Sequence, residues 1–486
     1  MYRKPSKKQL LIQRTIIFAI MVLSVTVIVA GTVLFILGYR IDGTNGRFEQ
    51  GALVQFDSQP NGATVSIDGI STGSQTASKR SVLAGEHAFL ITKDGYRPWE
   101  RTISVEAGTL TWLDYVRLVP TTLDKKTVRS YEEVSDVEAA PDRQTIIVQR
   151  RDDRPEFDLV DIRSQEVRST NVRLPDDVLT QADDVQHRYE LDEWDASGRY
   201  ILVRHFYGDS SEWVVFDTEN VSESVNVTRL LSIGLSDLQF ASTNGNVLYG
   251  LSDGVVRKLD LRNATISAGL ASQVESFDMY ETSIFTYIGR DASNRDIRVA
   301  GLYRDGDRSP HIIMSTEDEA VPLRIDTARY YGDDYIVVSE GLEVTVLGGS
   351  YPASGQSTAS TLDEVTTFTL SSQPEQLNFS PDGDYILARS GLSVVTYEIE
   401  HDRLNRAEVE TSESKSRSLQ WLDAAHLSAT YDGHLSMRDF DGTNVHVIMP
   451  IVNGFDATLS QNGRYIYGVN KTDDTYRLER VTMILE

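Results

Sequence analysis

The sequence predicts an all-β protein with a single transmembrane helix near its N-terminus, and three observations carry this prediction. A run of 23 residues without a charged side chain lies close to the N-terminus. Short segments of alternating apolar and polar residues, separated by glycine-containing turns, fill most of the remaining chain. One short phrase also recurs in the C-terminal three quarters, which indicates a supersecondary unit that is used several times.

The composition sets the first limits on structure and function. The length of 486 residues favours two to four domains, and the absence of cysteine excludes disulfides, thiolate metal ligands and a cysteine nucleophile. The chain has 47 basic and 72 acidic residues, a formal charge of −25. Residues 1–40 contain six bases and no acid, so the remainder has 41 bases against 72 acids, or −31. Because so acidic a surface repels phosphate, we expect no nucleic-acid partner.

The uncharged run predicts a transmembrane helix over residues 15–37, with Thr15 and Leu37 at its ends. A helix of this length spans roughly 34 Å, enough for a hydrocarbon core of about 30 Å. The basic tail, residues 1–14, should stay in the cytoplasm, which makes the lipid bilayer a partner and places all later residues outside the cell membrane. A signal peptide cleaved after Ala30 is the alternative, but the bulky Ile28 and the continuing apolar run favour an uncleaved anchor.

Residues 51–119 predict a small β-sandwich. Segments 51–56 and 63–67 alternate between apolar and polar residues, a turn separates them, and no helical period appears. The motif Pro60-Asn61-Gly62-Ala63, followed by Gly85-Glu86-His87 and Lys93-Asp94-Gly95-Tyr96, resembles a PEGA domain, with Asn61 where the family name has Glu. This resemblance implies a β module of bacterial surface and envelope proteins that has no agreed enzymatic activity.

One candidate binding patch follows the last of these motifs and consists of Tyr96, Arg97 and Trp99. Exposed aromatic rings at this place would offer a surface for carbohydrate or for a partner protein. Packing of the rings inside the sandwich is the structural alternative.

Residues 121–486 predict a β-propeller. The phrase Phe379-Ser380-Pro381-Asp382-Gly383-Asp384-Tyr385 has weaker copies at 194–202 and 459–466, and each copy leads into an aromatic-led strand. Eight strands of this kind begin at Thr145, Tyr200, Val247, Ile284, Tyr335, Tyr385, Leu427 and Tyr465. Their mean spacing of about 46 residues suits four-stranded blades.

The copies predict eight blades, with seven as the alternative, and a strand from about 121–129 that completes the last blade. Such closure removes exposed sheet edges, and we expect a dry, packed hub. The repeats resemble those of Tol-associated and WD-type propellers, although no Trp-Asp dipeptide ends the strands. Two-residue hairpin turns are predicted at Asp253-Gly254, Glu340-Gly341, Ser390-Gly391 and Asp432-Gly433.

No motif in the chain predicts a catalytic residue, a metal ligand or a cofactor. Gly250-Leu251-Ser252-Asp253-Gly254 has the spacing of a hydrolase elbow, but strand-like residues follow it where the elbow needs a helix. His426, His434 and His446 would lie on successive strands, which favours structural or surface histidines over a shared metal. Acidic pairs lack the spacing of a calcium loop and favour solvated loop charge; they are Asp152-Asp153, Asp176-Asp177, Asp183-Asp184 and Asp333-Asp334.

These expectations favour a bacterial, membrane-anchored, extracytoplasmic binding or scaffold protein and not an enzyme. Its propeller head would recognise a protein or an envelope glycan. A glycan or peptide hydrolase that uses the propeller funnel is the first alternative, and a purely structural envelope component is the second. The sequence does not identify the ligand.

Overall fold

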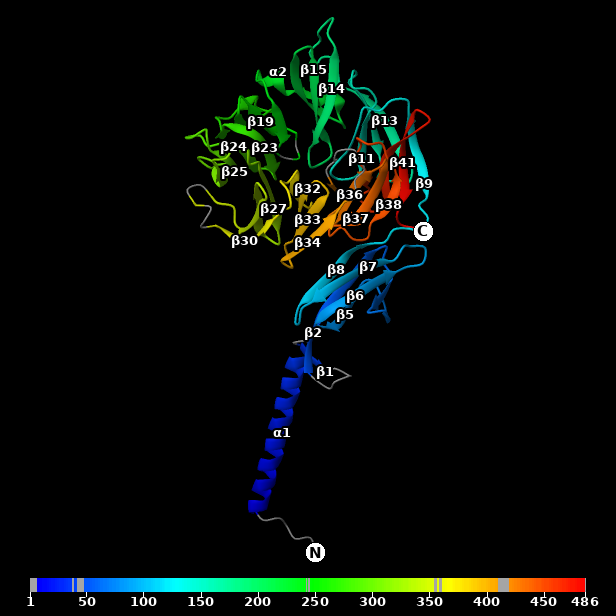
Figure 1. Ribbon diagram of the computed structural model, residues 1–486, viewed down its shortest axis with the longest axis vertical. Coiled ribbons are helices and arrows are strands. Elements are labelled where there is room, and N and C mark those ends of the chain that lie inside the picture. The colour runs from blue at the N-terminus through cyan, green and yellow to red at the C-terminus, as the bar shows by residue number, and fades with distance from the viewer. Residues whose placement is uncertain are drawn as a thin grey trace. The chain divides into compact units, whose positions relative to one another are not determined.

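The computed structural model describes residues 7–36, 39–41, 48–241, 243, 245–353, 356–357, 361–409 and 419–485. The chain divides into two compact units, one of residues 1–122 with 484–486 and one of residues 123–483. Helix α1 and a β-sandwich belong to the first unit, and a ring of sheets forms the second (Figure 1). The predicted helix end Leu37 and the first six residues of the predicted basic tail lie outside the described residues.

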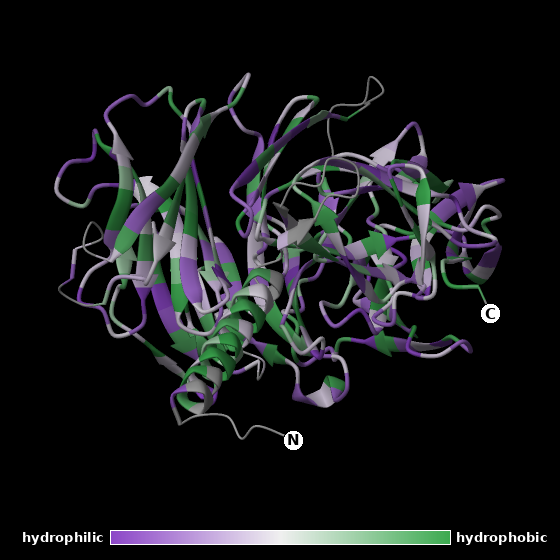
Figure 2. Ribbon diagram, turned by 90° about the horizontal axis from the view of Figure 1, so that it is seen from below, coloured by the Kyte–Doolittle hydropathy of each residue, from purple (hydrophilic) through white to green (hydrophobic). Residues whose placement is uncertain are grey.

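Helix α1 (Lys7–Ile36) is apolar along most of its length (Figure 2). Its segment Arg14–Leu34 has a mean hydropathy of 2.7, and in length and composition it can cross a membrane or serve as a signal sequence. The hydroxyls of Thr15, Thr26 and Thr32 donate to backbone carbonyls one turn earlier, at 3.0, 2.9 and 2.8 Å. These bonds satisfy the three hydroxyls within the helix, so they add little polarity to an apolar segment.

Two four-stranded sheets face each other in the first unit. One sheet contains β1 (Tyr39–Ile41), β2 (Phe48–Gln59), β5 (Ser78–Leu83) and β8 (Leu110–Arg117). The other contains β3 (Thr64–Ile67), β4 (Ile70–Gln75), β6 (Gly85–Thr92) and β7 (Trp99–Val105). All pairings are antiparallel except that of β2 with β8.

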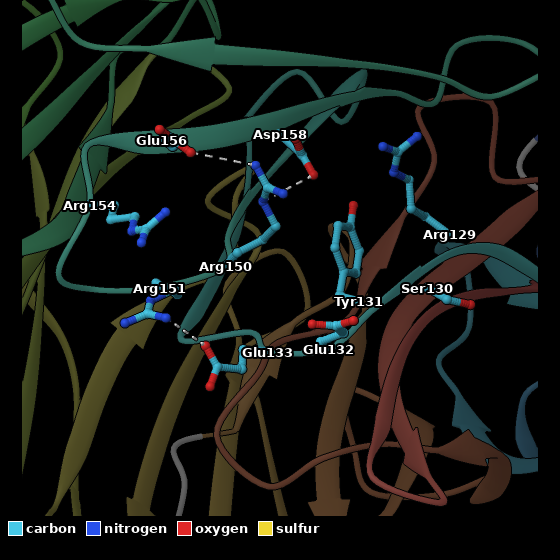
Figure 3. Close-up of a pocket in the computed structure, with 10 residues that line it drawn as sticks. All are labelled: Arg129, Ser130, Tyr131, Glu132, Glu133, Arg150, Arg151, Arg154, Glu156 and Asp158. Atoms are coloured by element: carbon cyan, nitrogen blue, oxygen red, sulfur yellow. Dashed lines mark ion pairs between the residues drawn. The ribbon is translucent and has the colours of Figure 1, made fainter.

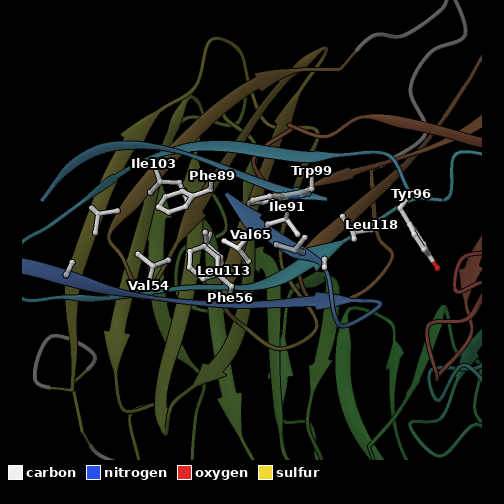
Figure 4. Packing of buried hydrophobic residues seen from close by; sticks show 14 residues of the cluster. Val54, Phe56, Val65, Phe89, Ile91, Tyr96, Trp99, Ile103, Leu113 and Leu118 are labelled. Carbon is white, nitrogen blue, oxygen red and sulfur yellow. The ribbon is translucent and has the colours of Figure 1, made fainter. Parts of the chain in front are cut away.

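The sandwich encloses one hydrophobic core, in which strands contribute alternate residues (Figure 4). Phe56 and Phe89 meet at a centroid distance of 5.6 Å, and Val65, Ile91 and Trp99 are almost completely buried beside them. The alternation along β7, where every second residue is buried, follows from the period of two in a strand. The predicted small β-sandwich is therefore confirmed.

The second unit contains eight antiparallel sheets among its described residues. In chain order, blade 1 consists of β10 (Asp136–Ala139), β11 (Thr145–Gln149), β12 (Glu156–Asp161) and β13 (Arg168–Arg173); blade 2 of β14 (His187–Trp194), β15 (Tyr200–Tyr207), β16 (Ser210–Asp217) and β17 (Val225–Asn226); blade 3 of β18 (Asp237–Phe240), β19 (Val247–Ser252), β20 (Val255–Asp260), β21 (Thr265–Ile266) and β22 (Ala271–Ser272); and blade 4 of β23 (Val274–Tyr280), β24 (Ile284–Arg290), β25 (Arg298–Arg304) and β26 (His311–Thr316). Short helices η1 (Val221–Glu223) and α2 (Val227–Leu231) flank β17.

The remaining four sheets complete the ring. Blade 5 consists of β27 (Leu323–Tyr330), β28 (Asp333–Glu340), β29 (Glu343–Gly349) and β30 (Leu362–Thr369); blade 6 of β31 (Gln376–Phe379), β32 (Tyr385–Ser390), β33 (Ser393–Glu398) and β34 (Arg403–Glu408); blade 7 of β35 (Gln420–Trp421), β36 (His426–Tyr431), β37 (His434–Asp439) and β38 (His446–Pro450); and blade 8 of β39 (Thr458–Leu459), β40 (Tyr465–Thr472), β41 (Thr475–Thr482) and β9 (Lys125–Tyr131). In most of the ring the first strands of successive sheets contact one another, which places these strands innermost.

The sequence repeats correspond to the second strand of every sheet. Each of the eight predicted strands is found, and six begin at the predicted residue; β28 and β36 begin two residues and one residue earlier. The chain thus forms an eight-bladed propeller, which settles the choice between eight and seven.

The ring closes through β9, which comes from the beginning of the unit and pairs with the last strand, β41. Figure 1 shows these two strands side by side. A continuous apolar cluster joins the last blade to the first and includes Val137 and Val148 of blade 1 with Tyr467 and Leu478 of blade 8. A closing strand from the start of the unit was predicted, and the structure places it at Lys125–Tyr131.

The recurrent phrase has a hydrogen-bonding explanation. The Ser380 hydroxyl accepts the backbone N–H of Tyr385 at 3.1 Å, and Ser460 does the same for Tyr465 at 3.0 Å. In the copy at 194–202 the carboxylate of Asp195 accepts the N–H of Tyr200 at 2.8 Å. The turn between first and second strand thereby satisfies the N–H that begins the second strand.

The predicted hairpin turns differ in which residues they use. Asp253-Gly254 and Asp432-Gly433 occupy both central positions with positive φ, as in type I′ turns. Ser390 and Glu340 instead end their strands, and the turns are Gly391-Leu392 and Gly341-Leu342. Glycine in the first central position with positive φ is the arrangement of a type II′ turn, which corrects the prediction at these two sites.

Candidate functional site

The hub of the propeller is bordered by the innermost strands, whose inner edges have no further strand to pair with. Side chains from one blade instead bond to the backbone of the next blade. Gln239 of β18 donates to the Phe277 carbonyl at 2.9 Å and accepts the Met279 N–H at 2.7 Å. Gln376 of β31 makes the same pair of bonds with the backbone of Leu419, at 2.7 and 3.0 Å. These bonds supply partners for backbone groups at the strand edges.

Two acidic residues have the same role. Glu193 of β14 accepts the N–H of Phe240 at 2.9 Å, and Asp326 of β27 accepts the N–H of Phe379 at 2.7 Å. Each carboxylate therefore joins its blade to the next blade in the ring.

We call the acidic residues of these inner strands the hub carboxylates; they are Asp192, Glu193, Asp237, Asp278 and Asp326. Loss of hydration raises the pKa of Glu193 to about 8 and that of Asp326 to about 7, and the charges of neighbouring hub carboxylates add to the shift. The same causes raise the pKa of Asp192 to about 6.

The hub is not dry, and this part of the prediction is wrong. Asp192 and Asp278 are exposed, and the other three hub carboxylates are only partly buried. Two of the hub carboxylates, Glu193 and Asp326, satisfy a backbone N–H group of the next inner strand, which an apolar side chain cannot do. The described residues include no group of three or more side chains suited to hold a metal ion.

The second candidate site is a pocket where the closing strand meets blade 1, which we call the closure pocket. Its volume is about 450 Å³. It is lined by Arg129, Ser130, Tyr131, Glu132, Glu133, Arg150, Arg151, Arg154, Glu156 and Asp158 (Figure 3). The first five residues belong to β9 and the segment after it, and the others belong to β12 and the loop between β11 and β12.

The charges of the closure pocket are only partly paired with one another. Arg150 lies 3.7 Å from the carboxylate of Asp158 and 3.8 Å from that of Glu156. Arg151 bonds to Asp153 at 2.7 Å and lies 3.7 Å from Glu133. Arg129 and Arg154 form no ion pair with any described residue.

Tyr131 is 6% exposed, and its hydroxyl has no hydrogen-bond partner among the described residues. Burial and the nearby charge of Asp158 raise the pKa of Tyr131 to about 12, although the arginines oppose this shift. Figure 3 shows the hydroxyl directed toward Asp158 and Arg129.

A third polar cluster lies inside blade 2. The carboxylate of Glu212 accepts hydrogen bonds from the Thr180 N–H at 2.7 Å and the Thr180 hydroxyl at 2.5 Å, and it bonds His205 at 2.9 Å. The other ring nitrogen of His205 lies 2.8 Å from His187. Burial alone would raise the pKa of Glu212, but its hydrogen bonds outweigh this effect and lower the pKa to about 2. The cluster ties the segment that links blades 1 and 2 onto blade 2.

The predicted patch of Tyr96, Arg97 and Trp99 is largely internal. Trp99 is 1% exposed and Tyr96 is 7% exposed, and both belong to the sandwich core. The Tyr96 hydroxyl accepts the N–H of Leu485 at 2.7 Å, and Arg97 is partly buried. These positions favour the packing alternative for the two rings, and a binding role for the three residues stays a prediction.

The other motifs of the sequence fall in structural positions. The Gly250–Gly254 motif is the β19–β20 hairpin, with a strand where an elbow needs a helix. His426 is buried between Asp423 and Asp439, at 2.7 and 3.5 Å. His434 is exposed and lies at the other end of the β36–β37 hairpin, next to the turn. Most of the acidic pairs are exposed loop residues, but Asp334 is 5% exposed and binds Arg329.

The sequence did not predict the hub carboxylates, the closure pocket or the Glu212 cluster. The concentration of three arginines in the loop Arg150-Arg151-Asp152-Asp153-Arg154 is the signal that could have drawn attention to the pocket.

Comparison with known proteins gives one family match and several likenesses of fold. Residues 53–121 match the PEGA domain. No curated protein matches the chain. Among solved structures, the C-terminal WD40 domain of Sif2 is similar over 74% of this chain and 98% of its own, with 11% identity and a TM-score of 0.48.

Hsv2 of Kluyveromyces lactis is similar over 73% of this chain and 99% of its own, with 11% identity and a TM-score of 0.39. At such identities and TM-scores the likeness concerns the fold alone. The comparisons therefore give one family match, the PEGA domain over residues 53–121.

Proposed function

We propose that this protein is a bacterial, single-pass membrane protein whose extracytoplasmic propeller binds a protein or an envelope glycan and acts as a scaffold. The observation that carries the proposal is the closed eight-bladed ring in a chain that begins with an apolar helix. A ring that takes its last strand from its own beginning holds the loops of all blades on a rigid frame, and such loops commonly carry binding sites.

The membrane topology is supported by the charge distribution. Arg14 and Lys8 lie at the N-terminal side of the apolar segment, with no acidic residue before Asp42. Basic residues on one flank favour the cytoplasm for that flank. The acidic remainder of the chain then lies outside.

Because the chain lacks cysteine, introduced cysteines test this topology directly. Ser372→Cys lies in an exposed loop of the propeller and Lys8→Cys lies in the tail. A membrane-impermeant maleimide should label Ser372→Cys in intact cells and Lys8→Cys only after permeabilisation. Labelling in the reverse order would contradict the proposed topology.

Binding is tested with the full chain in lipid nanodiscs. Nanodiscs with the protein are incubated with solubilised envelope material and with purified envelope glycans, and empty nanodiscs serve as the control. We expect one partner to be retained and to bind again after purification. Failure of every purified partner to bind again would contradict the binding proposal.

A hydrolase that works in the hub is the second candidate, and the exposed Asp192 with its pKa raised to about 6 favours it. A carboxyl group that titrates near neutral pH suits a general acid. Turnover of a glycan or peptide by the full chain, abolished by Asp192→Asn and retained in Asp152→Asn, would establish this function. Equal turnover in both variants would reject Asp192 as the acid.

A further inference from the structure

The closure pocket has the size and the position of a small-molecule site. Two segments from different blades form it, the end of β9 in blade 8 and the β11–β12 loop in blade 1. Its volume of about 450 Å³ falls within the usual range for small ligands, roughly 300–1,000 Å³.

Three arginines in this pocket have N–H donors that form no hydrogen bond with a described carboxylate. Arg129 and Arg154 are exposed and pair with no described carboxylate. The contacts of Arg150 with Asp158 and Glu156, at 3.7 and 3.8 Å, are too long for hydrogen bonds. A guanidinium group presents a planar fork of N–H donors that matches a carboxylate. The arginines therefore favour a ligand with a carboxylate group.

The acidic residues of the pocket favour a second kind of group on the same ligand. Glu132 forms no ion pair with any described residue, and Glu133 makes only the 3.7 Å contact with Arg151. These exposed carboxylates repel a bare anion and favour a ligand that also brings hydrogen-bond donors. A hydroxyl group can donate to a carboxylate and accept from an arginine at the same time. The pocket thus suits a ligand that combines a carboxylate with several hydroxyls.

The charge balance supports this choice. Four arginines face four acidic residues in the lining, so the pocket is formally neutral within a chain that has 72 acidic and 47 basic residues. The Tyr131 hydroxyl, nine-tenths buried and without a partner, adds one more unused polar group beside Arg129. Unpartnered buried polar groups are rare in folded proteins.

We propose that the closure pocket binds an acidic sugar unit, a ring that carries one carboxylate and several free hydroxyls. This inference rests on the proposed binding function and names the ligand class. Arg129 and Arg154 bind the carboxylate, while Glu132 and Glu133 accept hydrogen bonds from the hydroxyls.

The test uses the full chain in detergent micelles and measures dissociation constants by ligand-observed NMR. The probes are glucuronate, glucose, acetate, inorganic phosphate and a short peptide with an acidic C-terminus. The double variant Arg129→Gln/Arg154→Gln removes the unpaired cations. Arg262→Gln/Arg308→Gln is the matched control, because these two arginines are also exposed and lie outside the pocket.

We expect glucuronate to bind at least about tenfold more tightly than glucose and acetate. The pocket double variant should lose at least about tenfold in affinity for glucuronate, whereas the control keeps the affinity of the parent protein. All four arginines are exposed, so both variants should melt at the temperature of the parent protein.

Equal affinity for glucuronate and glucose would overturn the proposal, and so would an unchanged affinity in the pocket variant. Binding of acetate or phosphate as tight as that of glucuronate would overturn the proposal too, because the pocket would then recognise the negative charge alone. Tighter binding of the peptide would assign the pocket to a protein ligand. If the pocket variant keeps its affinity for glucuronate while the parent protein binds a purified envelope partner, this inference fails and the proposed binding function stands.

Discussion

Two groups of carboxylates in the same ring shift their pKa in opposite directions. Glu212 in blade 2 is 2% exposed, and its pKa is lowered to about 2. Glu193 in the hub is less buried, yet its pKa is raised to about 8. Glu212 is bonded by Thr180 and His205, whereas Glu193 receives one backbone N–H and faces other carboxylates. Burial raises the pKa of both carboxylates; the hydrogen bonds to Glu212 outweigh this effect, whereas the single backbone N–H bonded to Glu193 does not.

The largest expected effect on stability comes from removing the charge of Glu212, the carboxylate that accepts several hydrogen bonds. Glu212→Gln should lower the free energy of unfolding by about 3 kcal/mol, since it leaves His205 beside a neutral group and removes one acceptor from Thr180. Calorimetry of the full chain in detergent measures this loss. Glu219→Gln, at a side chain that is 70% exposed, is the control and should change stability by less than about 0.5 kcal/mol. A loss below about 1 kcal/mol in Glu212→Gln would contradict the account.

The acid dependence of stability should show the same interaction. The folded pKa of Glu212 lies below its ordinary value of 4.5, so its contribution is fully present above pH 4.5 and declines as the pH falls toward 2. The stability difference between the parent protein and Glu212→Gln should therefore shrink between pH 5 and pH 3. A constant difference across this interval would show that the ionised form is not what stabilises blade 2.

Neutralising a hub carboxylate should raise the free energy of unfolding, whereas Glu212→Gln lowers it. Glu193→Gln keeps an acceptor for the Phe240 N–H and removes a charge whose folded pKa is raised to about 8. The charged form costs stability as the pH rises from about 4.5 to 8, so the variant should be more stable by at least about 1 kcal/mol at pH 9 and equal at pH 4. Thermal unfolding at the two pH values measures this, and Asp326→Asn should behave alike. Destabilisation at pH 9 would remove the contrast with Glu212.

The smallest effects extend the comparison to hydroxyl groups. Ser380→Ala removes the acceptor of the Tyr385 N–H and should cost about 1 kcal/mol. Ser339 is equally buried but its hydroxyl has no partner among the described residues, so Ser339→Ala should be neutral or slightly stabilising. Thermal unfolding of both variants under the same conditions checks the pair. Equal losses would mean that hydrogen bonding at these two positions does not matter.

The eight second strands could be predicted because their signals are local. A turn such as Ser380–Gly383 fixes its own hydrogen bonds within a few residues, and the strand that follows starts with an aromatic residue. The turn before the strand that begins at Thr145 departs from this pattern at one position. Arg143 takes the place that glycine has in other copies, and it adopts the positive φ of 56° that glycine accepts more readily.

The candidate sites could not be predicted because ring curvature brings their residues together. Asp192, Asp237, Asp278 and Asp326 come from four different blades. The closure pocket joins the first strand of the unit to blade 1 only after β9 has paired with β41. These contacts correspond to no characteristic spacing in the sequence, whereas a turn forms between residues that are consecutive in the chain.

Closure of the ring by β9 is the central claim, and a disulfide tests it most directly. Ser130 of β9 and Arg477 of β41 lie opposite each other in the antiparallel register, at a separation suited to a disulfide. The chain has no cysteine of its own, so Ser130→Cys/Arg477→Cys should form one intramolecular disulfide on mild oxidation, seen by mass and by migration on a non-reducing gel. A control pair, Ser130→Cys/Arg406→Cys, should remain reduced, because Arg406 belongs to β34 in another blade. Failure of the first pair to link, or equal linking of both pairs, would contradict the closed ring.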